Sequence, residues 1–142
     1  MFNKVIRFFC LFFLSIITVT VINASASVYI WAMKKPVAFA PFSWLDHTYV
    51  CVGNSNNCYT CPPTYTKTGG NPAVGGYGDG DDAVCYAYCT LSYGVNGVCH
   101  QHSNRVLYPA GQTLAYCGVT GYTFSVGMWG TYGTNFNSCD CD

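Results

Sequence analysis

Two side chains of this sequence, those of His47 and Cys99, could act together in nucleophilic catalysis. A cysteine becomes a good nucleophile when the pKa of its thiol is lowered, and a helix N-terminus or a nearby imidazole has that effect. Cys99 lies where a helix is expected to begin, and His47 lies on an expected strand that could present its ring to the sulfur. The pair therefore predicts attack of a cysteine on a carbonyl group.

The other histidines are poorer partners for Cys99. His100 and His102 belong to the same expected helix as Cys99, where an adjacent side chain points about 100° away and position +3 aligns badly for proton transfer. The sequence has three histidines, so His47 is the predicted base. Two alternatives stay open: Cys99 could be bridged or simply buried, and His47 could be an ordinary strand residue.

Residues 1–26 have the pattern of a cleavable secretory signal peptide. Lys4 and Arg7 precede an uncharged apolar run that reaches Ile22, and Ala24 and Ala26 form the small-residue motif that signal peptidase recognises. An uncleaved membrane anchor is the alternative, although the run is shorter than the roughly 20 residues that span a bilayer. We expect a single secreted domain of residues 27–142, secreted or periplasmic, without stable membrane insertion after cleavage.

Removal of the signal peptide changes the cysteine count from even to odd. The chain has ten cysteines, and nine remain when Cys10 is removed. Thiols of exported proteins normally pair, so up to four disulfide bonds are expected with at least one sulfur left over. Cys99 is the best candidate for that thiol. Cys58 and Cys61 are expected to fasten a loop, in preference to forming a redox pair or half of a zinc site.

The charged residues exclude one class of partner. The predicted mature chain has four Lys and Arg against six Asp, a net charge of −2, so no basic patch is available for nucleic acid. The acidic run 79–82 lacks the spacing and closing Glu of a calcium loop, and the glycines of 69–80 lack the Lys-Ser/Thr of a phosphate loop. We expect no metal and no cofactor.

The elements that must position the pair follow from local patterns. A strand is expected at 45–52, with His47 on the face turned to the helix, and a helix at 96–108, begun by an Asn96 cap and ended by Pro109. Val106 and Leu107 should pack inward. The remaining expectations are an extended segment at 27–44, a loop at 53–82, a helix or strand at 83–93, and strands at 113–119, 121–129 and 131–136.

These elements predict an α+β fold in which one principal helix packs on an antiparallel sheet stapled by disulfides. The segments 45–52 and 96–109, with a histidine opening a strand and a later cysteine opening a helix, resemble the circularly permuted papain-like fold. That group includes relatives of the NlpC/P60 peptidases and lecithin:retinol acyltransferase-like proteins, in which the histidine precedes the cysteine. The run Cys99–His102 is similar to the Asn-Cys-Glu-His-Phe stretch of the acyltransferase group.

The resemblance implies a thiol protease or amidase with Cys99 as nucleophile and His47 as base, and it leaves the third polar residue unplaced. Backbone N–H groups at the helix start would hold the oxyanion. By analogy, the substrate would be a peptide or peptidoglycan-like, cell-wall peptide, or the protein would be delivered as a toxin. A competing hypothesis is a non-catalytic, disulfide-rich secreted protein that binds a partner through a surface rich in its twelve tyrosines.

Overall fold

The computed structural model describes residues 25–39 and 41–141, so almost all of the predicted signal peptide lies outside the described residues and its cleavage stays a prediction. The described part has four strands and three α-helices. The strands are β1 (Ser27–Pro36), β2 (Asp46–Val52), β3 (Cys58–Tyr59) and β4 (Asn71–Asp79). The α-helices are α2 (Gly80–Tyr88), α3 (Cys99–Leu107) and α4 (Tyr122–Trp129), and short 3₁₀ helices occupy Tyr108–Ala110 and Phe136–Ser138.

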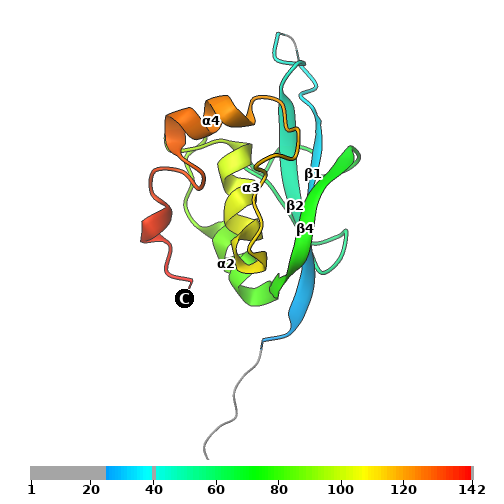
Figure 1. The fold of residues 1–142 in the computed structure, drawn as a ribbon, viewed down its shortest axis with the longest axis vertical. Coiled ribbons are helices and arrows are strands. Elements are labelled where there is room, and N and C mark those ends of the chain that lie inside the picture. Colours follow the sequence, from blue (N-terminus) through cyan, green and yellow to red (C-terminus); the bar gives the residue numbers. More distant parts are fainter. Residues whose placement is uncertain (1–24, 40, 142) are drawn as a thin grey trace, which may run out of the picture.

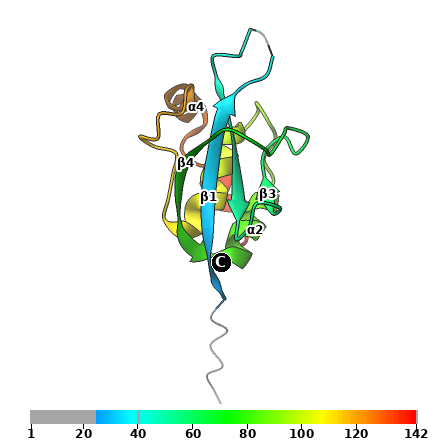
Figure 2. The same ribbon diagram turned by 90° about the vertical axis from the view of Figure 1, so that its right-hand side faces the viewer.

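The strands form one antiparallel sheet in the order β3-β2-β1-β4, which Figure 2 shows face-on. The helices lie against one face of this sheet and leave the other face without a helix (Figure 1). This arrangement confirms the predicted α+β class and the antiparallel sheet. The prediction of one principal helix is wrong, because α2 and α4 accompany α3. None of the described helices is long and apolar enough to cross a membrane.

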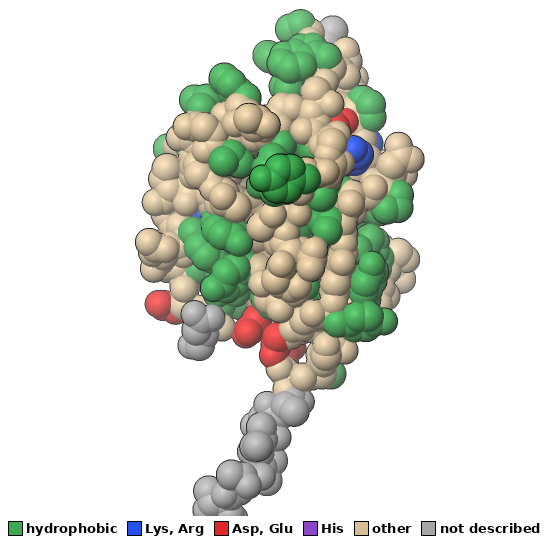
Figure 3. Space-filling view, in the orientation of Figure 1, with side chains coloured by type: hydrophobic (Ala, Val, Ile, Leu, Met, Phe, Trp, Pro, Cys, Tyr) green, Lys and Arg blue, Asp and Glu red, His purple; other side chains and the backbone are tan. Residues whose placement is uncertain are grey.

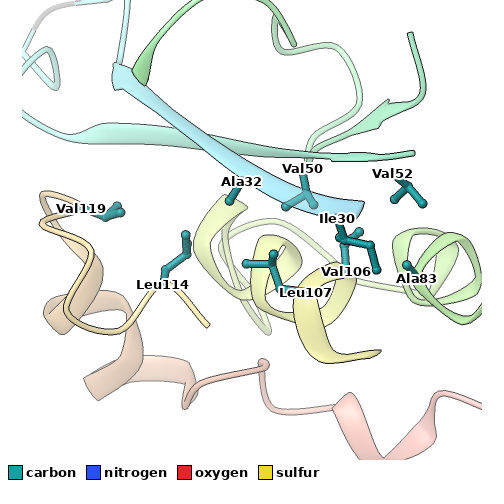
Figure 4. Close-up of a cluster of buried hydrophobic side chains, with 9 residues drawn as sticks. All are labelled: Ile30, Ala32, Val50, Val52, Ala83, Val106, Leu107, Leu114 and Val119. Carbon is teal, nitrogen blue, oxygen red and sulfur yellow. The ribbon is translucent and has the colours of Figure 1, made fainter. Parts of the chain in front are cut away.

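The core lies between the sheet and α3. Alternate residues of β1 and β2, such as Ile30 and Val50, point to the same face, where they meet Val106 and Leu107 of α3 (Figure 4). These four side chains are completely buried, so the inward orientation expected for Val106 and Leu107 is confirmed. The position of α3, and therefore of Cys99 at its start, is fixed by this packing.

The region 53–82 was expected to be one long loop, but it contains β3 and β4. Its glycines allow close approach of neighbouring chain segments. A Cβ atom on Gly75 would lie 2.7 Å from the Tyr29 hydroxyl oxygen, and one on Gly78 would lie 2.5 Å from the Pro109 carbonyl oxygen. The glycines that suggested a loop are thus required because Tyr29 and Pro109 lie too close to β4 for a larger residue at these two positions.

The strands expected after residue 113 are also absent from the described residues, which form turns, α4 and a 3₁₀ helix there. The apolar alternation of 121–129 does not correspond to alternating burial, since Ser125 is the buried residue of α4. Gly121 adopts a left-handed conformation, with φ of 87°, immediately before the helix. This segment packs on α3 as a helix instead, where the Ser125 hydroxyl contacts the side chains of His100 and Gln101.

Three disulfide bonds join Cys51 to Cys58, Cys85 to Cys141, and Cys89 to Cys139. Cys85 lies in α2 and Cys89, one turn later, caps its C-terminus, so the last two bonds hold the C-terminal tail against this helix. The free cysteines of the described residues are Cys61, Cys99 and Cys117. Cys58 is therefore a staple as predicted, whereas the same prediction for Cys61 is wrong.

Candidate functional site

Cys99 is the first residue of α3, a helix whose nine residues are all buried. The expected cap is wrong: Asn96 accepts a hydrogen bond from the backbone N–H of Ser92 (2.8 Å) instead of capping α3. The residue before the helix is Val98, whose N–H donates to the side-chain oxygen of Gln101 (3.1 Å). Gln101 thus fixes the chain at the helix start, and Cys99 does lie in the first turn as predicted.

The Cys99 thiol is protonated at neutral pH. Its side chain is 5% exposed, and burial raises its pKa above the value of an ordinary thiol. The backbone and hydroxyl of Thr48 and the backbone N–H of His100 act in the opposite direction. They do not outweigh burial, so the lowered pKa expected for a cysteine at a helix N-terminus is not found.

His47 is a neutral, buried imidazole. Burial lowers its pKa to about 4, with smaller contributions from the charges of Lys35 and His100. The ring nitrogen Nε2 lies 3.4 Å from the hydroxyl oxygen of Thr60, while Nδ1 is buried without a hydrogen-bond partner. The Thr66 backbone acts against burial and raises the pKa of this ring. Among the described residues, Nδ1 of His102 is likewise buried without a hydrogen-bond partner.

His47 and Cys99 reach the same edge of the sheet from opposite faces. The hydroxyl of Thr48 accepts a hydrogen bond from Ser103 of α3 (2.9 Å), so the helix lies on the Thr48 face of β2. His47 is the preceding residue of the strand and starts from the other face, contrary to the sequence-based expectation. The Thr48 carbonyl accepts a hydrogen bond from Thr60 (2.9 Å) at the edge that the short β3 leaves open.

A cavity of about 300 Å³ has both residues in its wall. It lies between the β1–β2 connection and α4, with the start of α3 as a further wall, and Figure 3 shows hydrophobic side chains on both sides of the hollow between these segments. No hydrogen bond joins His47 to Cys99, although both are fully described. The structure thus brings the two predicted residues to one cavity without direct contact through a hydrogen bond.

A second cavity of about 280 Å³ adjoins the first. Both cavities are lined by Val37, Phe39, His47 and Tyr65. The second also contacts Lys35 but does not contact Cys99. His47 is thus one of four residues shared by a cavity that contacts the thiol and a cavity that does not.

Two further buried residues lie at the site: His100, which the sequence analysis set aside as a base, and Ser125, which it missed. His100 is oriented by two contacts: Nε2 donates to the carbonyl oxygen of Asp46 (2.9 Å), and Nδ1 lies 3.0 Å from the hydroxyl oxygen of Ser125. These contacts connect α3 to β2 and to α4. Ser125 gave no signal in the sequence because its segment was predicted to be a strand. His100 is engaged with these partners, which agrees with its exclusion as the base for Cys99.

The site contains no evident metal centre, since the described residues include no group of three or more His, Cys, Asp or Glu able to hold an ion. Comparison with protein-family models, curated proteins and solved structures gave no match for this chain. Its chemistry is therefore argued from the residues of the cavity.

Proposed function

We propose that this protein is a cysteine hydrolase that cleaves amide bonds, with Cys99 as nucleophile and His47 as base. The observation that carries the proposal is that one cavity contacts both residues while Nδ1 of His47 is buried without a partner. Nδ1 of His102 is also buried without a partner, so the shared cavity with Cys99 is what distinguishes His47 as the base.

The protonation states favour a general-base mechanism instead of a preformed thiolate. The neutral imidazole takes the thiol proton as the Cys99 sulfur attacks the substrate carbonyl, forming a C–S bond. The protonated ring then gives its proton to the leaving nitrogen as the C–N bond breaks. Water hydrolyses the resulting thioester with His47 again acting as base, which releases the acid and restores the thiol.

The first backbone N–H groups of α3 supply the electrostatic part of this mechanism. N–H groups of the first helical turn have no partner within their own helix, and they carry the positive end of the helix dipole. Cys99 and His100 belong to that turn. Their N–H groups are well placed to stabilise an oxyanion formed on the carbonyl that Cys99 attacks.

Thr60 fits the third polar position that the papain-like resemblance left unplaced. It is 4% exposed, and its hydroxyl lies between the Thr48 carbonyl and the His47 ring. A permuted papain-like arrangement, in which the histidine strand precedes the cysteine helix, agrees with the order of β2 and α3. The three disulfides agree with an exported protein, for which a peptide is the most accessible amide substrate.

One observation favours a second candidate function, binding of a partner without catalysis. The sheet face that lacks helices has a cluster of aromatic side chains on β1 and β4. The Tyr29 ring lies 5.9 Å from Trp31 and 5.1 Å from Tyr77, and Tyr77 is 72% exposed. Exposed aromatic clusters are common at protein interfaces.

The proposal is tested with the mature protein and a library of internally quenched peptides. We expect hydrolysis by the wild-type protein, and a loss of at least about a thousandfold in kcat/KM for Cys99→Ala and His47→Ala. Cys117→Ala is the matched control, because Cys117 is also a free cysteine but lies outside the cavity, and it should retain activity. Full activity of Cys99→Ala would overturn the proposal. Binding of a partner that is abolished by Tyr77→Ser, without peptide hydrolysis, would support the second function.

A further inference from the structure

We infer that the substrate residue on the acyl side of the cleaved bond has a large apolar side chain, which the cavity at Cys99 binds. This inference rests on the proposed function and adds the class of substrate to it. It starts from the cavity wall, which combines aromatic and aliphatic side chains from separate elements. They are Phe39, Phe42, Leu45, Val98, Phe124 and Trp129.

The wall offers little to a charged substrate group. Asp46 is the one fully charged residue among those that line the cavity, and its carboxylate already accepts a hydrogen bond from the Thr120 N–H (2.8 Å). His47 and His100 have pKa values lowered mainly by burial and are neutral at pH 7. A carboxylate or ammonium buried here would lose its hydration without gaining a counter-ion. The cavity therefore disfavours a substrate with an acidic side chain at this position.

The size of the cavity limits the apolar group. Its volume of about 300 Å³ is at the lower end of the range for small-molecule pockets. Such a volume holds one large side chain, such as that of phenylalanine or leucine, with its adjoining backbone. A peptide residue is therefore the fitting occupant.

The identity of the two groups that contact the substrate places this residue on the acyl side. Cys99 becomes covalently bonded to the acyl group, whereas His47 gives its proton to the leaving nitrogen. The first cavity contacts Cys99, and the second contacts His47 but not Cys99. The acyl group therefore occupies the apolar cavity, and the leaving group extends past His47 into the cavity beside Lys35.

The first test uses two peptidyl chloromethyl ketones, acetyl-Ala-Phe and acetyl-Ala-Glu, which alkylate a thiol by displacement of chloride. We expect Cys99 to be alkylated at least about tenfold faster by the Phe probe, with the modified residue located by mass spectrometry. Phe42→Asp should reduce this preference, because it places a charge in the cavity wall. The fully exposed Tyr116, outside the cavity, provides the control Tyr116→Asp, which should keep the preference. Equal rates for both probes would overturn the inference and leave the proposed function intact.

A second test does not depend on reactivity. Acetyl-Phe-methylamide and acetyl-Glu-methylamide are titrated into the Cys99→Ala variant, and binding is followed by fluorescence of Trp129 in the cavity wall. We expect at least about tenfold tighter binding of the Phe compound. Such binding supports the inference even if no peptide is hydrolysed, a result that would count against the proposed function alone. Equal affinity, or tighter binding of the Glu compound, would overturn the inference.

Discussion

The hydroxyl oxygen of Thr60 lies 3.4 Å from Nε2 of His47, at the edge of β2 that the Cys99 thiol also approaches. The Thr60 hydroxyl hydrogen is donated to the Thr48 carbonyl (2.9 Å), so the lone pairs of this oxygen face the imidazole. We therefore assign the ring proton to Nε2, the tautomer in which this nitrogen donates to Thr60. Nδ1, the nitrogen without a partner, then carries the lone pair, which makes it the basic atom of the ring.

Thr60→Ala should impair the orientation of His47. We expect kcat for peptide hydrolysis to fall about tenfold with little change in KM, because the ring loses the acceptor that fixes its tautomer. The free energy of unfolding should fall by about 1 kcal/mol from the lost hydrogen bond to Thr48. Thr60→Ser keeps the hydroxyl and should restore kcat; a loss of activity that serine does not rescue would contradict the positioning role.

The pH dependence of Cys99 alkylation distinguishes the general-base mechanism from a preformed thiolate. Burial raises the pKa of this thiol, so its rate with iodoacetamide should keep rising at pH values above those at which an ordinary cysteine levels off. The half-exposed Cys117 should be modified before Cys99 and Cys61 in the folded protein. Rates followed by mass mapping test both points. A plateau for Cys99 reached below neutral pH would show a thiolate–imidazolium pair.

The parts of the fold that were predictable have a local physical cause. The β-branched and aromatic residues of 46–52 favour a strand in any context, and Pro109 limits the extent of α3. The pairing of Cys85 and Cys89 with the tail was not predictable, because the sequence left the structure of 83–93 and the disulfide connectivity open. Cys99 was correctly placed in the first turn of this helix, although the Asn96 cap used to place it there is wrong.

The parts that were missed depend on distant neighbours. Gly75 and Gly78 suggested a loop because glycine is common in loops. Their actual role, to allow the close approach of Tyr29 and Pro109, cannot be inferred from the local sequence. The alternation of 121–129 suggested a strand, whereas the contacts of Ser125 with His100 and Gln101 that accompany the helix join residues far apart in the sequence. The protonated state of the thiol was missed because helix position favours a thiolate locally, whereas the burial of Cys99 results from packing of the whole domain.

The buried imidazole of His102 should make stability depend on pH. Its Nε2 donates to the Ala87 carbonyl (2.9 Å), and burial lowers its pKa from 6.5 to about 4. Above pH 6.5 the His102 ring is neutral in both the folded and the unfolded protein, so its contribution to the free energy of unfolding is fully present. As the pH falls towards 4 the unfolded chain gains a proton that the folded protein does not, so the free energy of unfolding should fall by roughly 3 kcal/mol from this residue.

His102→Gln keeps a donor for Ala87 and cannot titrate. Urea unfolding between pH 7 and pH 4 should therefore show a shallower decline for this variant than for the wild type. The variant should keep part of the pH dependence of stability, because the pKa of His47 is also lowered to about 4. Identical slopes for the two proteins would show that His102 is protonated in the folded state.

Two glycines provide a matched pair of alanine substitutions. Gly78→Ala should lower the free energy of unfolding by about 1–3 kcal/mol, because its Cβ would lie 2.5 Å from the Pro109 backbone oxygen and β4 would have to move. Gly127, inside α4, has no atom within 4 Å of the same position. Gly127→Ala should therefore stabilise the protein by up to about 1 kcal/mol. Equal effects in chemical denaturation would contradict the close contact between β4 and the segment after α3.

Arg105 connects α3 to the chain segments that surround it. Its guanidinium is completely buried and donates to the carbonyl oxygens of Tyr132 (2.6 Å) and Thr90 (3.1 Å) and to the side-chain oxygen of Asn135 (2.5 Å). All three acceptors are neutral. The residue thus acts as a planar set of donors, not as half of an ion pair.

Arg105→Met should lower the free energy of unfolding by about 2–5 kcal/mol, because it leaves several buried acceptors unpaired. Arg105→Lys should recover only a small part, since one ammonium cannot reach all three oxygens. Lys67→Met is the control, because it removes a cation for which no hydrogen bond is found and should change stability by less than about 0.5 kcal/mol. Among the described residues no carboxylate pairs with Arg105, so its contribution should be nearly the same at about 0.1 M and 1 M salt. A strong salt dependence in urea unfolding would contradict the hydrogen-bonded arrangement.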